Sequence, residues 1–157
     1  MSVIDSLELK INEDDLFKIL KNETILENDR CSAMTILMDM ESERLVAFWE
    51  RVDFKKDAFW IPWYLSFYSR LDPIKALSIF SQLDQFPDNP ESYEMGTKIS
   101  LSAISKNADL VEKFLILTFQ EDWKQKWKQE YLEEILSSYP KLSFLLEEWK
   151  SYNTSDS

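Results

Sequence analysis

The chain has 157 residues, of which 45% are hydrophobic and 14% aromatic, and its formal net charge is −11. It contains no histidine, one glycine and one cysteine. The lack of histidine excludes histidine-dependent catalysis and zinc sites that require histidine. A single glycine excludes glycine-rich phosphate loops, and a single cysteine excludes an intramolecular disulfide. The hydrophobic content excludes a wholly disordered chain, and no apolar run approaches the ~20 residues of a membrane span. We expect a cytoplasmic protein without cofactor or metal, with a single helical domain over residues 1–152 and a disordered tail over 153–157.

The N-terminal third carries most of the acidic surplus. Residues 1–50 contain twelve Asp and Glu against five Lys and Arg, a net charge of −7, whereas residues 51–157 contain 17 against 13. The segment INEDDLFKIL predicts a helix capped at Asn12, with Asp15 at the reciprocal capping position. Only SLELKI and CSAMTILMDM have local patterns compatible with strands, and two short strands do not make a stable sheet.

Eight carboxylates of this third are the candidate binding surface for a cationic partner. They are Asp14, Asp15, Glu23, Glu27, Asp29, Asp39, Glu41 and Glu43. The segment DMESERLVAFWE also places acidic residues at several ligand positions of a calcium loop, but Arg44 stands where the sharp turn of that loop needs glycine. The pattern therefore favours a solvated helix over a calcium site.

Polar residues and prolines that begin helices recur at intervals of 15 to 18 residues along the rest of the chain. The predicted starts are Ser42, Asp57, Asp72, Asn89, Asn107, Asp122 and Pro140. Between them, apolar residues follow three- and four-residue steps, which is typical of amphipathic helices. One such stripe contains Leu45, Phe48, Trp49 and Val52.

The stretch DAFWIPWYLSFYSRLD, residues 57–72, concentrates six aromatic residues and could be either a core helix or a binding surface. Its apolar residues cover an arc of about 200° on a helix, which favours a position at the centre of the core. If the stretch contacts a partner, we expect Trp60 and Trp63 to be the aromatic anchors. Pro62 predicts that the helix begins near Trp60 or is kinked there.

The C-terminal half continues the helical pattern. The segment DWKQKWKQEYLEEILSSY predicts one helix whose apolar stripe begins at Trp123, with Lys124 and Lys128 directed to solvent. Another stripe contains Leu142, Leu145, Leu146 and Trp149. Gly96 lies inside a helical pattern and indicates a close contact between two helices.

These elements together predict an all-α protein. We expect about seven to eight short antiparallel helices, arranged as an irregular bundle or as a short HEAT-like stack of helical hairpins. The sequence does not distinguish these two arrangements.

The function that the sequence favours is a non-catalytic acidic protein-binding module. A nuclease must present a basic cleft to its substrate, and acidic inhibitors such as toxin-neutralising immunity proteins place carboxylates in that cleft, so a nuclease toxin is one possible partner. The first alternative is a helical-repeat adaptor that binds an extended peptide or a helix. The second is a small-molecule binder or enzyme with an aromatic pocket around Trp60, Trp63 and Tyr64. Direct nucleic-acid binding is disfavoured, because it needs an excess of cationic side chains.

Overall fold

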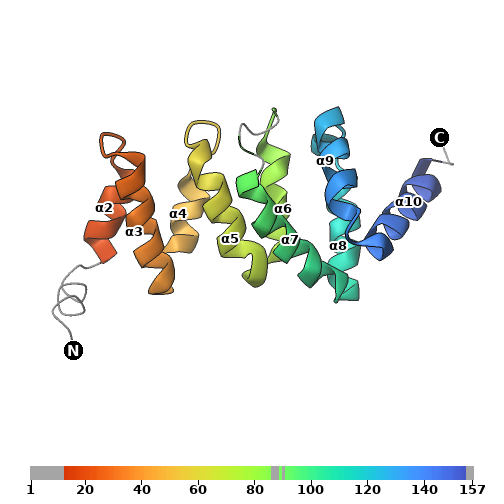
Figure 1. Cartoon of the computed structure of the whole chain (residues 1–157), viewed down its shortest axis with the longest axis horizontal. Helices are drawn as coiled ribbons and strands as arrows, with labels where there is room; N and C mark the ends of the chain where they lie inside the picture. The colour runs from red at the N-terminus through yellow and green to blue at the C-terminus, as the bar shows by residue number, and fades with distance from the viewer. Residues whose placement is uncertain (1–12, 86–88, 90, 155–157) are drawn as a thin grey trace. The chain divides into compact units, whose positions relative to one another are not determined.

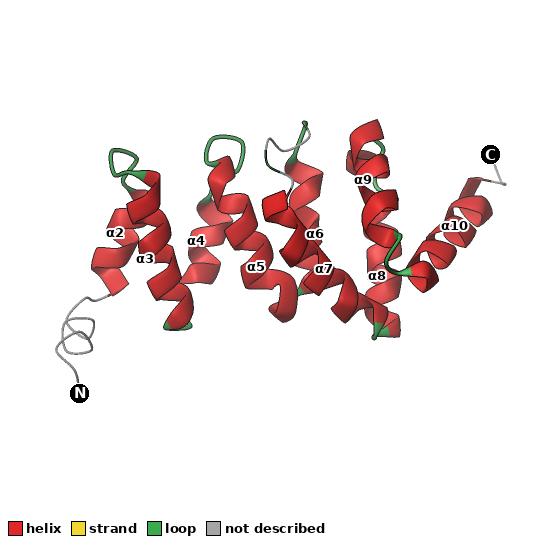
Figure 2. Cartoon of the chain, in the orientation of Figure 1, coloured by secondary structure: helices red, strands yellow, loops and turns green. Residues whose placement is uncertain are grey.

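The computed structural model describes residues 13–85, 89 and 91–154. All regular elements in these residues are helical, which confirms the predicted all-α fold (Figure 2). The described residues form nine α-helices, slightly more than the seven to eight expected, together with three short 3₁₀ helices. None of the described helices combines the length and apolar character that a membrane crossing requires.

The chain divides into two compact units, residues 1–52 and 53–157. The single domain expected over residues 1–152 stays a prediction, because two compact units can belong to one domain. The last helix runs to Thr154, so Asn153 and Thr154 are helical rather than part of the expected tail. Residues 155–157 lie outside the described residues.

The first unit contains α2 (Glu13–Lys21), α3 (Glu27–Asp39) and α4 (Leu45–Arg51). The chain runs along α2, turns, and returns antiparallel along α3 (Figure 1). The two helices form a hairpin whose apolar residues are buried: Leu16, Phe17 and Leu20 from α2, and Ala33, Met34 and Leu37 from α3. The segment CSAMTILMDM is therefore helical, while SLELKI and the expected cap Asn12 lie outside the described residues.

Helix α4 buries Leu45, Phe48 and Trp49, which confirms this part of the predicted apolar stripe. The helix begins at Leu45 rather than at Ser42. The cap position is Arg44 rather than Ser42, and the Ser42 hydroxyl instead donates a hydrogen bond of 3.0 Å to Glu13 Oε2. The ring of Phe48 lies 6.2 Å from that of Phe17, which joins α4 to α2.

The second unit is a succession of short helices joined by tight turns. They are η1 (Ala58–Trp60), α5 (Ile61–Leu71), α6 (Pro73–Leu77), η2 (Ser78–Gln82), α7 (Glu91–Ser105), α8 (Ala108–Thr118), η3 (Glu121–Trp123), α9 (Lys126–Leu136) and α10 (Pro140–Thr154). Most of the packing joins helices that are adjacent or next but one in the chain, with α5 against both α6 and α7 as the most extensive example.

Side-chain caps begin two of these helices as the sequence predicted. Asp72 Oδ1 accepts a hydrogen bond of 3.1 Å from the Lys75 amide at the start of α6. Asn107 Oδ1 accepts bonds of 3.0 and 3.2 Å from the amides of Asp109 and Leu110 at the start of α8. In both cases the side chain replaces a partner that the first helical turn lacks. Pro140 also begins α10 as expected.

The prediction of a single helix beginning at Asp122 is wrong. The chain forms η3, then an extended residue, Gln125, and only then α9. Lys128 is not directed to solvent but is 2% exposed, and its ammonium group donates a hydrogen bond to the Asp122 carbonyl. Gln129 Nε2 donates to the Trp123 carbonyl at 2.6 Å. These two side chains satisfy carbonyl groups that a continuous helix would have paired with its own amides.

The aromatic stretch lies in the core of the second unit, as the width of its apolar arc predicted. Trp60 is 0% exposed, and Tyr64 and Tyr68 are also buried. The Tyr64 ring packs 5.1 Å from Phe54 in an edge-on arrangement. Helix α5 begins at Ile61, so Pro62 occupies its first turn, where the missing amide costs no hydrogen bond.

Burial raises the pKa of Tyr64 from 10.0 to about 12, which predicts a loss of stability at alkaline pH. Between these two values the unfolded state has lost the phenolic proton and the folded state has kept it, so stability falls as pH rises from 10 towards 12. We expect Tyr64→Phe to remove up to about 2 kcal/mol of this pH dependence. Urea unfolding at several pH values between 9 and 12 measures it, with Tyr139→Phe as a control at a half-buried phenol. An unchanged pH profile in the Tyr64 variant would contradict the assignment.

Candidate functional site

The eight candidate carboxylates all lie on the first unit and are all exposed. They do not form one continuous face, because the α2–α3 hairpin separates them into two groups at its opposite ends. The α3-end group contains Asp14, Asp15, Asp39, Glu41 and Glu43. The loop group contains Glu23, Glu27 and Asp29.

The α3-end group is organised by contacts between the start of α2 and the segment that follows α3. Arg44 Nη1 lies 2.8 Å from Asp14 Oδ1 and 3.8 Å from Glu13 Oε2. The Arg44 guanidinium also lies 4.7 Å from the centre of the Phe17 ring, within the range of a cation–π contact. The Ser42–Glu13 hydrogen bond joins the same two segments. Arg44 therefore neutralises part of the acidic surface and links its two segments, a role that the sequence did not predict.

Glu41 adopts a left-handed backbone conformation, with φ of 55°. It follows α3 in a Schellman motif: the Ser42 amide donates to the Leu37 carbonyl at 3.1 Å, and the Glu41 amide donates to the Met38 carbonyl at 3.0 Å. Glycine is the usual residue at this position, because a Cβ is unfavourable in the left-handed region. The motif gives the turn from Asp39 to Glu43 a defined backbone geometry.

Replacing Glu41 with glycine should therefore stabilise the protein while removing one carboxylate. We expect the free energy of unfolding to rise by about 0.5–1 kcal/mol. Glu41→Ala is the matched control, because it removes the same charge but retains the Cβ, so it should give little or no gain. Urea unfolding of both variants measures the difference, and equal stabilities for the two would contradict the strain assigned to Glu41.

The loop group lies at the other end of the hairpin, where two polar contacts organise the connection. Asn22 Oδ1 accepts hydrogen bonds from the amide and the hydroxyl of Thr24, at 3.0 and 2.6 Å. Arg30 is 5% exposed, and its Nε and Nη2 donate to the Leu20 carbonyl at 2.9 and 2.7 Å. This guanidinium binds the C-terminal end of α2, where a positive charge is favourable.

The two expected aromatic anchors differ in their exposure. Trp60 is completely buried, so it supports the core and has no surface with which to contact a partner. Trp63 is half-buried on α5 and remains the only one of the two with accessible surface.

A groove of about 710 Å³ lies beside the start of α5 in the second unit. Its apolar walls come from the start of the aromatic stretch and from segments before and after that stretch: Phe54, Phe59, Ile61, Pro62, Leu83 and Tyr93. Lys55 and Asp84 stand at this groove and form an ion pair of 3.2 Å. The sequence predicted an aromatic pocket in this region, around Trp60, Trp63 and Tyr64. None of these three residues lines the groove.

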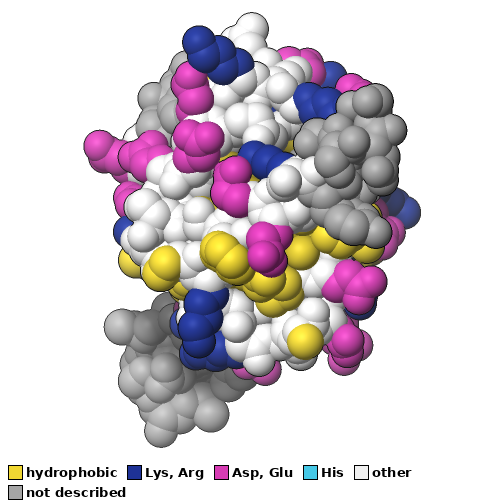
Figure 3. Space-filling model, turned by 90° about the vertical axis from the view of Figure 1, so that its right-hand side faces the viewer, with side chains coloured by type: hydrophobic (Ala, Val, Ile, Leu, Met, Phe, Trp, Pro, Cys, Tyr) yellow, Lys and Arg dark blue, Asp and Glu magenta, His cyan; other side chains and the backbone are white. Residues whose placement is uncertain are grey.

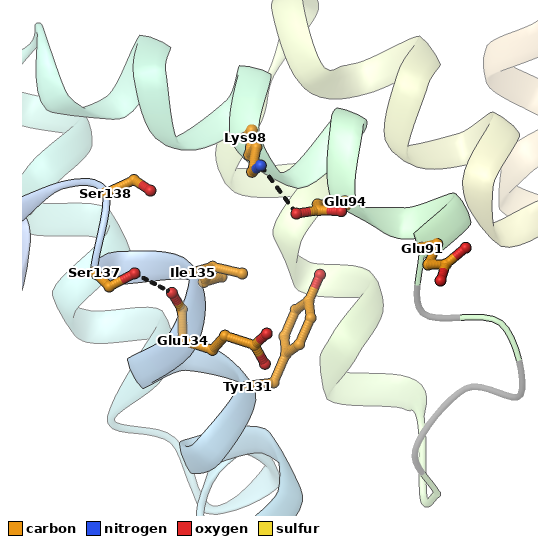
Figure 4. A pocket seen from close by; sticks show the side chains of 8 residues that line it. All are labelled: Glu91, Glu94, Lys98, Tyr131, Glu134, Ile135, Ser137 and Ser138. Carbon is orange, nitrogen blue, oxygen red and sulfur yellow. Dashed lines mark hydrogen bonds and ion pairs between the residues drawn. The ribbon is translucent and has the colours of Figure 1, made fainter.

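A second cavity, of about 330 Å³, lies between α7 and α9 and is lined by three glutamates (Figure 4). Glu91 and Glu94 come from α7, and Glu134 comes from α9. Lys98 Nζ lies 2.9 Å from Glu94 Oε1, and this hydrogen-bonded carboxylate raises the pKa of Lys98. Burial raises the pKa of Tyr131, whose ring stands between the two helices. The cavity brings carboxylates from two helices together, but one of them is already paired.

Within the described residues, no group of three or more Cys, Asp or Glu side chains is arranged to hold a metal ion. The acidic positions that resemble a calcium loop are divided between the end of α3, the Schellman turn and α4. Asp39 ends α3, and Glu50 lies inside α4. These residues therefore do not form one loop around a cation.

Comparisons of the chain with protein-family models, with curated proteins and with solved structures give no match.

Proposed function

We propose that the protein is a non-catalytic binding module that uses the α3-end group to bind a cationic protein. The observation that carries this proposal is the turn from Asp39 to Glu43, which presents three exposed carboxylates on a backbone held by a Schellman motif. Among the described residues, none of these three carboxylates has an ion-pair partner within 4.0 Å. A preorganised surface of this kind loses little conformational entropy when a partner binds.

The charge of the first unit supports the same proposal. With the net charge of −7 over residues 1–50, a partner with a basic surface is attracted over distances of about one Debye length, ~8 Å at physiological salt. A nuclease fits this description, because its substrate cleft is basic and carboxylates can occupy the positions of phosphate groups. We therefore propose a nuclease, such as a toxin, as the class of partner and inhibition as the outcome of binding.

The α3-end group has more carboxylates than the loop group, and three of its members lie within five residues. The loop group supplies three exposed carboxylates around a connection that Arg30 and Asn22 organise. We expect the α3-end group to provide most of the binding energy and the loop group to act mainly by long-range attraction, which affects the rate of association more than the lifetime of the complex.

The test is affinity capture from an extract of the native host, followed by mass spectrometry, with three forms of the full chain. The first is the wild type, and the second is Asp39→Asn/Glu41→Gln/Glu43→Gln. The third, Glu112→Gln/Glu133→Gln/Glu147→Gln, is a matched control that removes the same number of exposed carboxylates from the second unit. We expect a basic protein to be recovered by the wild type and the control but not by the α3-end variant. Recovery of the same proteins by all three would contradict the proposal.

The apolar groove beside α5 supports a second candidate function, an adaptor that binds an extended peptide. Such an interface would depend on apolar burial rather than on charge, so binding should survive high salt. The two candidates differ in their response to substitution: Phe59→Ala would weaken peptide binding in the groove, whereas the α3-end variant would leave it unchanged.

A further inference from the structure

One side of α10 is apolar at the surface of the second unit. The helix packs against α8 and α9 and buries Leu142 and Leu146, which are 1% and 3% exposed. Phe144 is 63% exposed and Leu145 is 37% exposed, so Leu145 does not belong to the buried stripe in which the sequence placed it. Figure 3 views the molecule from the side of α10 and shows an apolar band on this surface, with basic and acidic side chains at its borders.

Two opposite charges flank these apolar residues along the helix. Lys141 lies one turn before them and Glu148 one turn after, and both are exposed. At 100° per residue the four side chains fall within an arc of about 100°, and the two charges are separated by about 10 Å along the axis. We call Lys141, Phe144, Leu145 and Glu148 the α10 face. In the described part of the chain, neither of its charges lies within 4.0 Å of an opposite charge.

The order of these residues is self-complementary under a two-fold axis. When two copies of α10 run antiparallel with the axis between Phe144 and Leu145, residue 141 of each copy faces residue 148 of the other, and residue 144 faces residue 145. Each Lys141 then meets a Glu148, and the apolar residues meet at the centre. Isologous contacts of this type are the commonest interface in homo-oligomers, and antiparallel helices pack with side chains interlocked at crossing angles near 20°.

From this pattern we infer that the α10 face binds the same face of a second copy of the chain and forms a homodimer. The inference is independent of the acidic surface on the first unit. Four residues per copy make a contact well below the ~1,200 Å² typical of a stable interface, so the dimer should be weak and should form only as the protein concentration rises.

Sedimentation velocity of the full chain tests this directly. Between ~10 µM and ~1 mM, the range in which a weak complex populates, we expect the weight-average mass to rise from monomer towards dimer. Because Phe144 is largely exposed, Phe144→Glu should preserve the fold and abolish the rise. A wild type that stays monomeric over the whole range would overturn the inference.

Charge reversal tests the antiparallel register. Lys141→Glu alone places two glutamates opposite each other at both ends of the contact, and Glu148→Lys alone places two lysines there. Each single variant should therefore lower the self-association constant by about tenfold. The double variant Lys141→Glu/Glu148→Lys should restore association. A mixture of the two single variants should also associate, because each charge then meets its opposite.

Lys106→Glu is the matched control, because it makes the same change of charge at an exposed position between α7 and α8. It should leave self-association within about twofold of the wild type. If the single reversals on α10 behave like this control, or if the double variant and the mixture fail to recover association, the proposed register is wrong.

Discussion

Trp60→Ala is expected to destabilise the protein by about 3–5 kcal/mol, the largest effect of any single substitution considered for this chain. Trp60 is 0% exposed and stands at the junction of η1 and α5. Its ring centre lies 4.6 Å from that of Phe59. Alanine would remove the whole indole and leave a cavity that the surrounding helices fill only in part. Urea unfolding followed by circular dichroism measures the loss.

Trp63→Ala is the matched control for this prediction, because it removes the same side chain three residues later, in the first turn of α5. Trp63 is half-buried, so less of its surface leaves water on folding and the loss should be clearly smaller. If Trp60→Ala costs under about 1 kcal/mol, or if the two variants lose the same stability, Trp60 is not the centre of the core.

Gly96→Ala should destabilise the protein by about 2–3 kcal/mol, although alanine is the better helix former by about 1 kcal/mol. Gly96 lies on α7 where that helix meets α5. A Cβ on Gly96 would lie 2.7 Å from Leu65 Cβ, 3.2 Å from the Leu65 carbonyl carbon and 3.3 Å from the Ser66 nitrogen. These atoms belong to the backbone of α5 or are attached directly to it, so the helix itself must move.

Met95→Ala is the control for Gly96, because it introduces alanine at the preceding position of α7, where the side chain is 73% exposed. It should change the free energy of unfolding by less than about 0.5 kcal/mol. Shortening Leu65 to alanine should not rescue Gly96→Ala, since the closest contact is with a Cβ that alanine retains. A Gly96→Ala variant as stable as the wild type would show that α5 and α7 are not in close contact.

Much of the fold follows from local sequence signals. Asp72 and Asn107 begin helices because their side chains replace missing backbone partners within two or three residues. The stripe of Leu45, Phe48 and Trp49 is buried because its spacing matches the helical repeat. Gly96 indicated a close helix contact, which the structure confirms, because a glycine is otherwise unfavourable inside a helix.

The features that the sequence did not predict depend on contacts between distant residues. The segment from Asp122 has a continuous helical pattern, yet the chain breaks at Gln125. Trp123 is held instead by a hydrogen bond of 2.9 Å from its indole nitrogen to Ser81 Oγ and by an edge-on contact with Phe80. Lys128 turns inward to bind the carbonyl that the break exposes, and burial lowers its pKa. Neither partner of Trp123 could be identified from local spacing.

The sequence predicted which residues belong to the candidate site but not how they are arranged in space. The acidic character of its eight residues predicted their exposure, since a carboxylate loses hydration when it is buried. Their division into two groups follows from the antiparallel path of α2 and α3, which places Asp14 near Glu43 and both far along the hairpin from Glu27. The pairing of Arg44 with Asp14 also depends on that path.

The most direct test of the proposed function is the rate at which the basic protein recovered by capture associates with the full chain, measured by stopped flow at low and high salt. We predict fast association with the wild type, with a rate that falls steeply as salt rises. The Asp39→Asn/Glu41→Gln/Glu43→Gln variant should associate more slowly and depend less on salt, whereas the Glu112→Gln/Glu133→Gln/Glu147→Gln control should resemble the wild type. Equal rates and equal salt dependence for the wild type and the α3-end variant would contradict the proposal that this surface binds a cationic protein.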